Sequence, residues 1–225
     1  MLGSSFLRFV LLINYIIIIY ENEDERKYKG KEKIRKYCTA EKKYDRIEKV
    51  EKKKNGEKKM FQKFYPSEDI NSTYDIDFES YFEKGYRGII FDVDNTLVFH
   101  NAPADERAKA LFQRLKKIGF DFCFTSNNKE PRVKKFCQDV GGTHYIYKAN
   151  KPSTKGYKKA MRLMGTNKEN TFFVGDQLFT DVYGANRTGI HSILVKPMNP
   201  KEEIQIVLKR YLEKIVLWRY RSKKR

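Results

Sequence analysis

The feature that most constrains the fold is an alternation of short apolar runs with amphipathic segments between residues 88 and 221. The runs predict strands, and the segments between them predict helices because their apolar residues recur at helical spacing. Strands are expected at about 89–91, 120–124, 143–147, 171–174 and 192–195. Helices are expected at about 105–118, 132–140, 152–164 with Pro152 in the first turn, just before 188, and 201–221. This order predicts an α/β fold with a doubly wound, three-layer Rossmann-like parallel sheet.

Two carboxylates directly follow the first apolar run. Asp92 and Asp94 come after Ile89–Phe91. Side chains two apart in a strand lie on the same side, so both acids can reach one site. Ligands of parallel sheets bind at the carboxyl ends of the strands. Taken alone, the pair fits a cation site, a proton-transfer pair, or a turn with a helix cap.

Polar residues also follow the later runs. Ser126 and Asn127 come after the second run, Lys151 after the third, and Asp176 and Asp181 after the fourth. Each alone has a structural explanation, such as a helix cap, a surface lysine or a turn. In a parallel sheet, however, all of them lie at one edge. Their joint occurrence around one crevice favours a functional site.

Four segments resemble the motifs of the haloacid dehalogenase (HAD) superfamily of phosphatases. They are Asp92–Thr96, Ser126–Asn127, Lys151–Pro152 and Gly175–Asp181. The sequences of Tyr86–Gly88 and Thr125–Asn128 are similar to those of the YqeG-type branch of subclass IIIA. That branch itself resembles the mitochondrial phosphatidylglycerophosphate phosphatases. The resemblance extends from about Met60 to Arg221.

The resemblance implies a phosphomonoesterase with an aspartyl-phosphate intermediate. Asp92 would be the nucleophile, and Lys151 would steady it together with the charge on the transferring phosphoryl group. Asp94 would protonate the leaving oxygen and later deprotonate the attacking water. For the first step Asp94 must start protonated, which crowding by other carboxylates would favour.

The resemblance also implies a Mg²⁺ cofactor. Its ligands would be Asp92, the backbone carbonyl of Asp94, and Asp176, with Asp181 close by or acting through water. Oxygen-rich, partly hydrated coordination suits this hard cation.

Two hydroxyl or amide groups are expected to bind substrate phosphate beside Lys151. They are the Ser126 hydroxyl and the backbone N–H of Asn127. Thr125 is the alternative hydroxyl, and Thr96 is expected to fix the turn after the first strand.

The spacing of the motifs leaves no room for a cap domain. Between Asp94 and Ser126 only a hairpin and one helix fit, and between Asn128 and Lys151 only one helix and one strand. Phe99 and His100 would form at most a small flap. An open site suits a bulky substrate, such as a lipid headgroup at a bilayer or a phosphorylated macromolecule.

The charge and the composition of the chain limit the classes of partner that it is expected to bind. The formal net charge is +18, from 47 basic and 29 acidic residues, which favours phosphorylated substrates, anionic lipid surfaces or RNA. The three cysteines form no disulfide framework, which fits a reducing compartment. The three histidines are scattered, which argues against a zinc site. The preferred prediction is a phosphatidylglycerophosphate phosphatase, cytoplasmic and peripheral at the inner membrane face. The alternatives are a soluble phosphometabolite phosphatase and a basic RNA- or ribosome-binding protein with a HAD fold.

The termini differ from the body of the chain. Residues 6–20 are apolar but shorter than the ~20 residues of a spanning helix, and residues 21–59 are mostly charged, which predicts disorder. Residues 60–225 are expected to form the phosphatase domain. Residues 1–59 are then either an extension upstream of a true start at Met60 or a membrane tether. The basic amphipathic helix 201–221 would pack on the sheet or lie at an anionic membrane.

Overall fold

The computed structural model describes residues 61–199, 213, 214 and 216–222. Within the unit Lys63–Arg225, the described residues form a sheet of six strands in the order β1-β6-β5-β2-β3-β4, and every neighbouring pair is parallel. They are β1 Glu68–Ile70, β2 Gly88–Phe91, β3 Asp121–Thr125, β4 His144–Ile146, β5 Thr171–Gly175 and β6 His191–Val195. The predicted parallel, doubly wound sheet is confirmed. The strand order reverses at β2, which lies between β3 and β5, and ligands bind at such a point.

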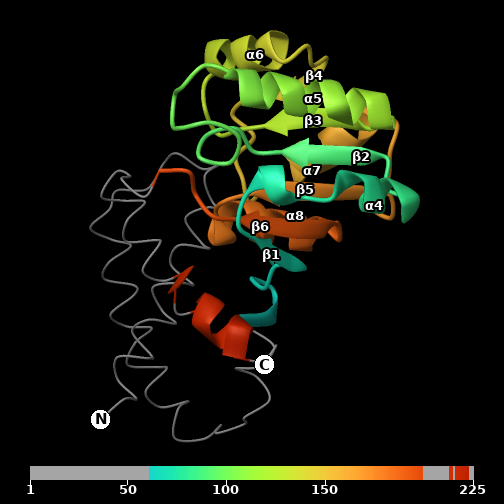
Figure 1. The fold of residues 1–225 in the computed structure, drawn as a ribbon. Coiled ribbons are helices and arrows are strands. Elements are labelled where there is room, and N and C mark those ends of the chain that lie inside the picture. The colour runs from blue at the N-terminus through green and yellow to red at the C-terminus, as the bar shows by residue number, and fades with distance from the viewer. Residues whose placement is uncertain (1–60, 200–212, 215, 223–225) are drawn as a thin grey trace, which may run out of the picture. The chain divides into compact units, whose positions relative to one another are not determined.

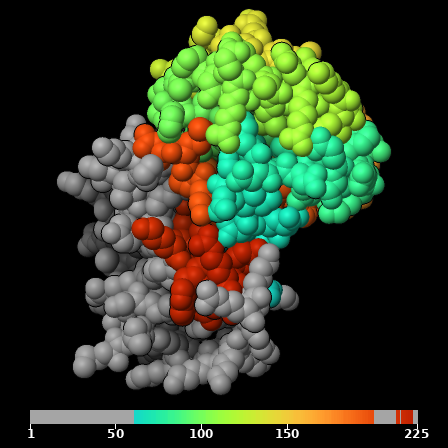
Figure 2. All heavy atoms as spheres, viewed as in Figure 1, coloured from blue at the N-terminus to red at the C-terminus, as the bar shows by residue number. Residues whose placement is uncertain are grey.

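Helices cover both faces of the sheet, which makes three layers (Figure 1). They are α4 Phe78–Glu83, α5 Glu106–Ile118, α6 Glu130–Asp139, α7 Thr154–Leu163 and α8 Tyr183–Thr188. Along β2 the side chains alternate between two cores. Ile89 and Phe91 join the core that includes α4, α5 and α6, and Ile90 joins the one that includes α7 and α8. In Figure 2 green spheres, the segment around α5, and teal spheres, the segment before β2, make up much of the face toward the viewer.

Local signals explain where the helices begin and end. The Asp105 carboxylate accepts a hydrogen bond from Ala108 N and caps α5, and Gly119, with φ of 106°, ends it. Helix α7 begins at Thr154, capped by Ser153. Pro152 therefore precedes the cap, so its predicted place in the first turn is wrong. The Lys151–Pro152 peptide bond is cis.

Several elements at the edges of the domain were not predicted. Strand β1 has three residues, the 3₁₀ turn η1 (Thr73–Asp75) has three, and α4 has six. Segments this short carry too few residues for a periodic pattern. Of the expected helix 201–221, the described residues 213, 214 and 216–222 are helical, and 201–212 lie outside the described residues.

The described chain carries no cap domain. Within residues 61–199, a loop, α5 and β3 separate Asp94 from Ser126, and α6 and β4 separate Asn128 from Lys151. Among the described helices, none combines the length and hydropathy that crossing a membrane requires. The apolar segment 6–20 and the rest of residues 1–59 lie outside the described residues.

Candidate active site

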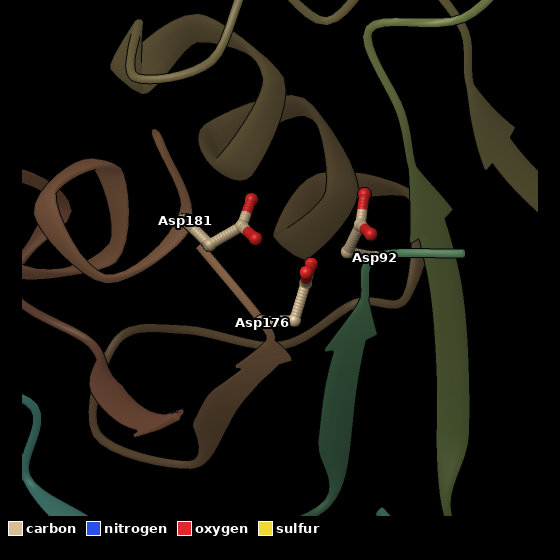
Figure 3. A group of neighbouring side chains, drawn as sticks. All are labelled: Asp92, Asp176 and Asp181. Carbon is tan, nitrogen blue, oxygen red and sulfur yellow. The ribbon is translucent and has the colours of Figure 1, made fainter. Parts of the chain in front are cut away.

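Three buried carboxylates meet at the carboxyl edge of the sheet. Asp92 directly follows β2, Asp176 directly follows β5, and Asp181 lies in the π-helical turn η2 (Leu178–Val182). One carboxylate oxygen from each residue lies within 4.8 Å of the corresponding oxygens of the other two. Figure 3 shows the three side chains pointing toward a common space. The structure thus brings together the predicted acids that follow the first and fourth strands.

Two local features carry Asp181 into this cluster. The π turn is closed by a 3.2 Å hydrogen bond from Val182 N to Gln177 O, and Gln177 N donates to Asp181 Oδ2 at 3.0 Å. Irregular π turns of this kind are frequent at functional sites. Gly175 is required because a Cβ there would lie 2.7 Å from Asp181 Oδ2. The missing side chain at Gly175 therefore leaves room for the Asp181 carboxylate.

Lys151 joins the cluster as its counter-ion. Its Nζ lies 2.5 Å from Asp92 Oδ1 and 2.7 Å from Asp181 Oδ1, and the residue is 4% exposed. The Asn127 side chain holds the Lys151 backbone at both ends, because Oδ1 accepts from Lys151 N at 2.8 Å and Nδ2 donates to Lys151 O at 3.3 Å. Asn127 thus orients the lysine, a contact that the sequence did not predict.

The shared ammonium does not balance the buried negative charge. Burial raises the pKa of Asp92 to about 7; the Asp181 and Asp94 carboxylates also raise it, and Lys151 lowers it. Burial opposes the charge of Lys151, but the Asp181 and Asp92 carboxylates raise the pKa of its ammonium above the ordinary value. One ammonium therefore faces two carboxylates, and Asp176 adds a third acid. Buried oxygen ligands with excess negative charge fit a divalent cation.

Thr96 links two acids of the cluster. Its buried hydroxyl lies 3.2 Å from Asp92 Oδ2 and 3.3 Å from Asp176 Oδ1. A single hydroxyl proton serves one of these oxygens at a time. Thr96 therefore contacts the predicted nucleophile directly, beyond its expected place in the turn.

Ser126 is the hydroxyl that reaches the cavity. Its Oγ accepts a hydrogen bond from Asn128 N at 3.1 Å, which leaves the hydroxyl proton to be donated to a ligand. Thr125 is fully buried, and its Oγ1 has no hydrogen-bond partner among the described residues. Ser126 and Asn127 line the cavity and Thr125 does not. The alternative assignment of the hydroxyl to Thr125 is therefore unnecessary.

Asp94 lies in a different environment from the three acids. Its Oδ1 accepts from Arg132 Nη2 at 2.9 Å and from Asn101 N at 2.8 Å, and its Oδ2 lies 3.4 Å from Asn128 Nδ2. These contacts are all with donors, but the Asp94 carboxylate is also close enough to Asp92 to raise the pKa of that acid. The expected protonation of Asp94 through carboxylate crowding stays a prediction.

A cavity of about 350 Å³ opens above these residues. Every lining residue carries a polar side chain: Asp92, Asp94, Asn95, His100, Asn101, Ser126, Asn127, Asn128, Lys151, Gln177 and Thr180. Sequence reasoning assigned no role to Asn101, Asn128 or Arg132. The position of Arg132 could have indicated a role. A cation in the first turn of a helix is unfavourable beside the positive end of the helix dipole, so its presence there suggests a compensating contact with an acidic group.

Comparisons with known proteins agree with this geometry. The HAD-hydrolase-like family model matches residues 148–199. The chain is 39% identical over 160 residues to "Probable phosphatase YqeG" of Bacillus subtilis, covering 70% of this chain and 92% of that protein.

Two more distant proteins are also similar to this chain. The chain is 29% identical over 165 residues to phosphatidylglycerophosphate phosphatase 1 of Arabidopsis thaliana, covering 66% of this chain and 45% of that protein. Among solved structures, the cobalt-bound deoxy-D-mannose-octulosonate 8-phosphate phosphatase of Haemophilus influenzae aligns with a TM-score of 0.39 and 15% identity, covering 60% of this chain and 89% of that one. With the YqeG similarity spanning nearly the whole relative, the chain belongs to the YqeG-type phosphatases of the HAD superfamily and is a phosphomonoester hydrolase.

Proposed function

We propose that this phosphatase is Mg²⁺-dependent, acts through an aspartyl-phosphate at Asp92, and hydrolyses phosphatidylglycerophosphate. The observation that carries the proposal is the buried Asp92–Lys151 pair at the base of an uncapped cavity whose lining residues all have polar side chains. Such a cavity offers hydrogen-bonding and charged groups for a phosphorylated headgroup and no apolar side chain for an acyl chain. The acyl chains would remain outside it.

In the first step, Asp92 attacks phosphorus through one carboxylate oxygen. The new Asp92–phosphorus bond forms as the bond from phosphorus to the ester oxygen breaks, and the electron pair leaves with that oxygen. Asp94 gives it a proton, so the leaving group departs as an alcohol. Lys151 and the Ser126 hydroxyl face the phosphoryl oxygens, with the backbone N–H of Asn127 as a further donor.

In the second step, water releases the phosphate. Asp94, now deprotonated, removes a proton from the water as its oxygen bonds to phosphorus. The bond between phosphorus and Asp92 breaks, inorganic phosphate leaves, and both acids return to their starting states. Lys151 pairs with the Asp92 carboxylate before the attack and donates a hydrogen bond to the remaining carbonyl oxygen of the aspartyl-phosphate, so it holds the nucleophile in place through both steps.

The cluster of acids would hold the cation. Asp92, Asp176, Asp181 and the backbone carbonyl of Asp94 are the proposed ligands. Bound there, Mg²⁺ would supply positive charge that reduces repulsion between the Asp92 carboxylate and the phosphate dianion.

Two exposed aromatic residues near the cavity support a lipid substrate. Phe99 is 53% exposed and precedes His100, which lines the cavity. Tyr147 is 41% exposed and precedes Lys148, whose N–H binds Asn128 O. Aromatic rings favour the boundary between water and lipid, and a charge of +18 favours an anionic inner membrane face. The similarity to the plant phosphatase agrees with this substrate.

A substrate panel tests the proposal. The full-length protein is assayed for phosphate release with Mg²⁺ from phosphatidylglycerophosphate in mixed micelles and from soluble phosphoesters, and again after chelation. We expect turnover of the lipid that is lost on chelation and restored by Mg²⁺. Efficient turnover of soluble phosphoesters alone would identify a metabolite phosphatase instead. Activity restored by another divalent ion but not by Mg²⁺ would refute the metal assignment.

The domain boundary is a second part of the proposal. Residues 60–225 form the catalytic domain, and residues 1–59 are an extension that the chemistry does not require. A form that begins at Met60 is expected to match the full chain on soluble phosphoesters. A large loss of turnover in that form would overturn the boundary.

A further inference from the structure

A charged side chain beside the cavity has no part in the steps above. Arg132, in the first turn of α6, extends its guanidinium to Asp94, with 2.9 Å between Nη2 and Oδ1. Both side chains are largely buried, at 15% and 12% exposure. Because one partner is the acid that serves the leaving oxygen, the pair bears on the reaction. The role inferred for Arg132 therefore rests on the proposed function.

Arg132 occupies an unfavourable position except for this contact. Its Nε is buried without a hydrogen-bond partner, and the positive end of the helix dipole lies beside it. Its guanidinium lies 5.6 Å from the Phe136 ring centroid, which fixes its direction along the helix. The contact with Asp94 is the compensating interaction, and charge-assisted hydrogen bonds of this kind are strong.

The two oxygens of Asp94 are held differently. Oδ1 accepts two short hydrogen bonds, from Arg132 Nη2 at 2.9 Å and Asn101 N at 2.8 Å. Oδ2 has one long contact, 3.4 Å to Asn128 Nδ2, and that amide also lies 3.3 Å from Asn101 Oδ1. Two donors occupy Oδ1, whereas Oδ2 is the less occupied oxygen.

We propose that Arg132 is a positioning residue that fixes Asp94 through Oδ1, so that Oδ2 exchanges the proton with the leaving group and with water. The proton on Oδ2 passes to the ester oxygen as the phosphorus–oxygen bond breaks. A proton from the attacking water then returns to Oδ2. Arg132 stays bound to Oδ1 throughout and does not line the cavity.

Substrates with leaving groups of different basicity distinguish this positioning role from a purely structural role and from a role in substrate binding. An alkyl phosphate such as phosphatidylglycerophosphate releases an alkoxide that requires a proton, whereas p-nitrophenyl phosphate releases a stable phenolate that does not. We therefore expect Arg132→Gln to lower kcat for the lipid ester roughly 100-fold, which is typical for loss of general acid catalysis. For p-nitrophenyl phosphate we expect less than about a threefold change in kcat, and for both substrates KM should stay within about threefold.

Two further variants complete the experiment. Arg132→Lys keeps one donor and should recover part of the lipid turnover. Lys135→Gln removes an exposed cation from the same helix and should behave as wild type on both esters. Equal losses on both substrates, or a raised KM with unchanged kcat, would overturn the positioning role. The p-nitrophenyl phosphate activity also reports whether Arg132→Gln is folded.

Assays of the wild-type protein distinguish a failure of this inference from a failure of the proposed function. If it cleaves p-nitrophenyl phosphate and sn-glycerol 3-phosphate but not the lipid, the substrate proposal fails, and the Arg132 comparison is made with these two soluble esters. If it cleaves none of the esters, the proposed function and the positioning role fail together.

Discussion

The base and one side of the cavity are built in opposite ways. At and beneath the base lie four buried charged groups, Asp92, Asp176, Asp181 and Lys151, of which Asp92 and Lys151 line the cavity. Asp92 and Asp176 directly follow strands, and ion pairs and a π turn bring Lys151 and Asp181 to them. The side wall consists of Asp94, Asn101 and Asn128, with Arg132 bound to Asp94. The charged members of the wall are partly exposed, and hydrogen bonds with loop groups and a helix turn hold them.

This difference predicts different consequences of mutation. The base combines the proposed catalytic groups with a buried ion pair, so a change there should alter both turnover and the free energy of unfolding. The wall holds one acid through local contacts near solvent. A change there should alter turnover of particular substrates and leave the fold nearly intact.

The largest effect is expected at the centre of the base. Asp92→Asn replaces the proposed attacking carboxylate with an amide that cannot form the acyl phosphate, so turnover should fall at least about 10⁴-fold. Phosphate release measures the loss, and circular dichroism should show an unchanged fold. Asp121→Asn, at the opposite edge of the sheet, is the control and should retain full turnover. Biological function that survives Asp92→Asn would favour a binding protein over an enzyme.

The second effect tests the coupling of chemistry and stability in the base. Lys151→Met removes the ammonium that Asp92 and Asp181 share and leaves two buried carboxylates without it. Turnover should fall about 10²–10³-fold, and the free energy of unfolding should fall by about 3 kcal/mol. Denaturant titration in chelator measures the second quantity. Lys158→Met, on the exposed side of α7, should change neither. A variant as stable as wild type would show that the ion pair is not structural.

The same contrast explains what the sequence could predict. Asp92, Asp176 and Lys151 follow strands closely, so a correct strand order is enough to place them on one edge. Arg132 reaches Asp94 only because of the direction in which α6 leaves its loop, which no periodic pattern encodes. Asn101 acts through its backbone N–H, a group that nearly every residue has, so its identity carries no signal. Strand β1 and helix α4 were missed because they are too short to show periodicity.

A third effect concerns stability alone and depends on pH. Burial raises the pKa of Asp92 to about 7 from an ordinary value of 3.8. The folded state therefore holds a proton that the unfolded state releases, so this contribution to stability is present below pH ~4 and is lost as pH rises through 7. In chelator, Asp92→Asn should be more stable than wild type at pH 8 by about 2 kcal/mol, and no more stable at pH 4. Thermal melts at the two pH values measure this.

Mg²⁺ provides the control for the pH effect. It should stabilise wild type at pH 8 more than it stabilises Asp92→Asn, because the variant lacks one proposed ligand charge. An Asp92→Asn protein less stable than wild type at both pH values would mean that Asp92 is held as a carboxylate by Lys151 without a metal.

The smallest effect is expected outside both regions, at the exposed aromatic residues. Phe99→Ser and Tyr147→Ser remove rings that we place at the lipid boundary, and each should lower turnover of phosphatidylglycerophosphate in mixed micelles about fivefold, equivalent to about 1 kcal/mol. Turnover of p-nitrophenyl phosphate should not change, since neither residue lines the cavity.

Leu163→Ser is the matched control: this side chain is 42% exposed, but it ends α7, near the start of β5 and away from the cavity. An equal loss in the control would assign the effect to general surface apolarity, and a loss on the soluble ester would assign it to the shape of the cavity. Only a loss confined to the two aromatic residues and to the lipid places the membrane at the open side of the cavity.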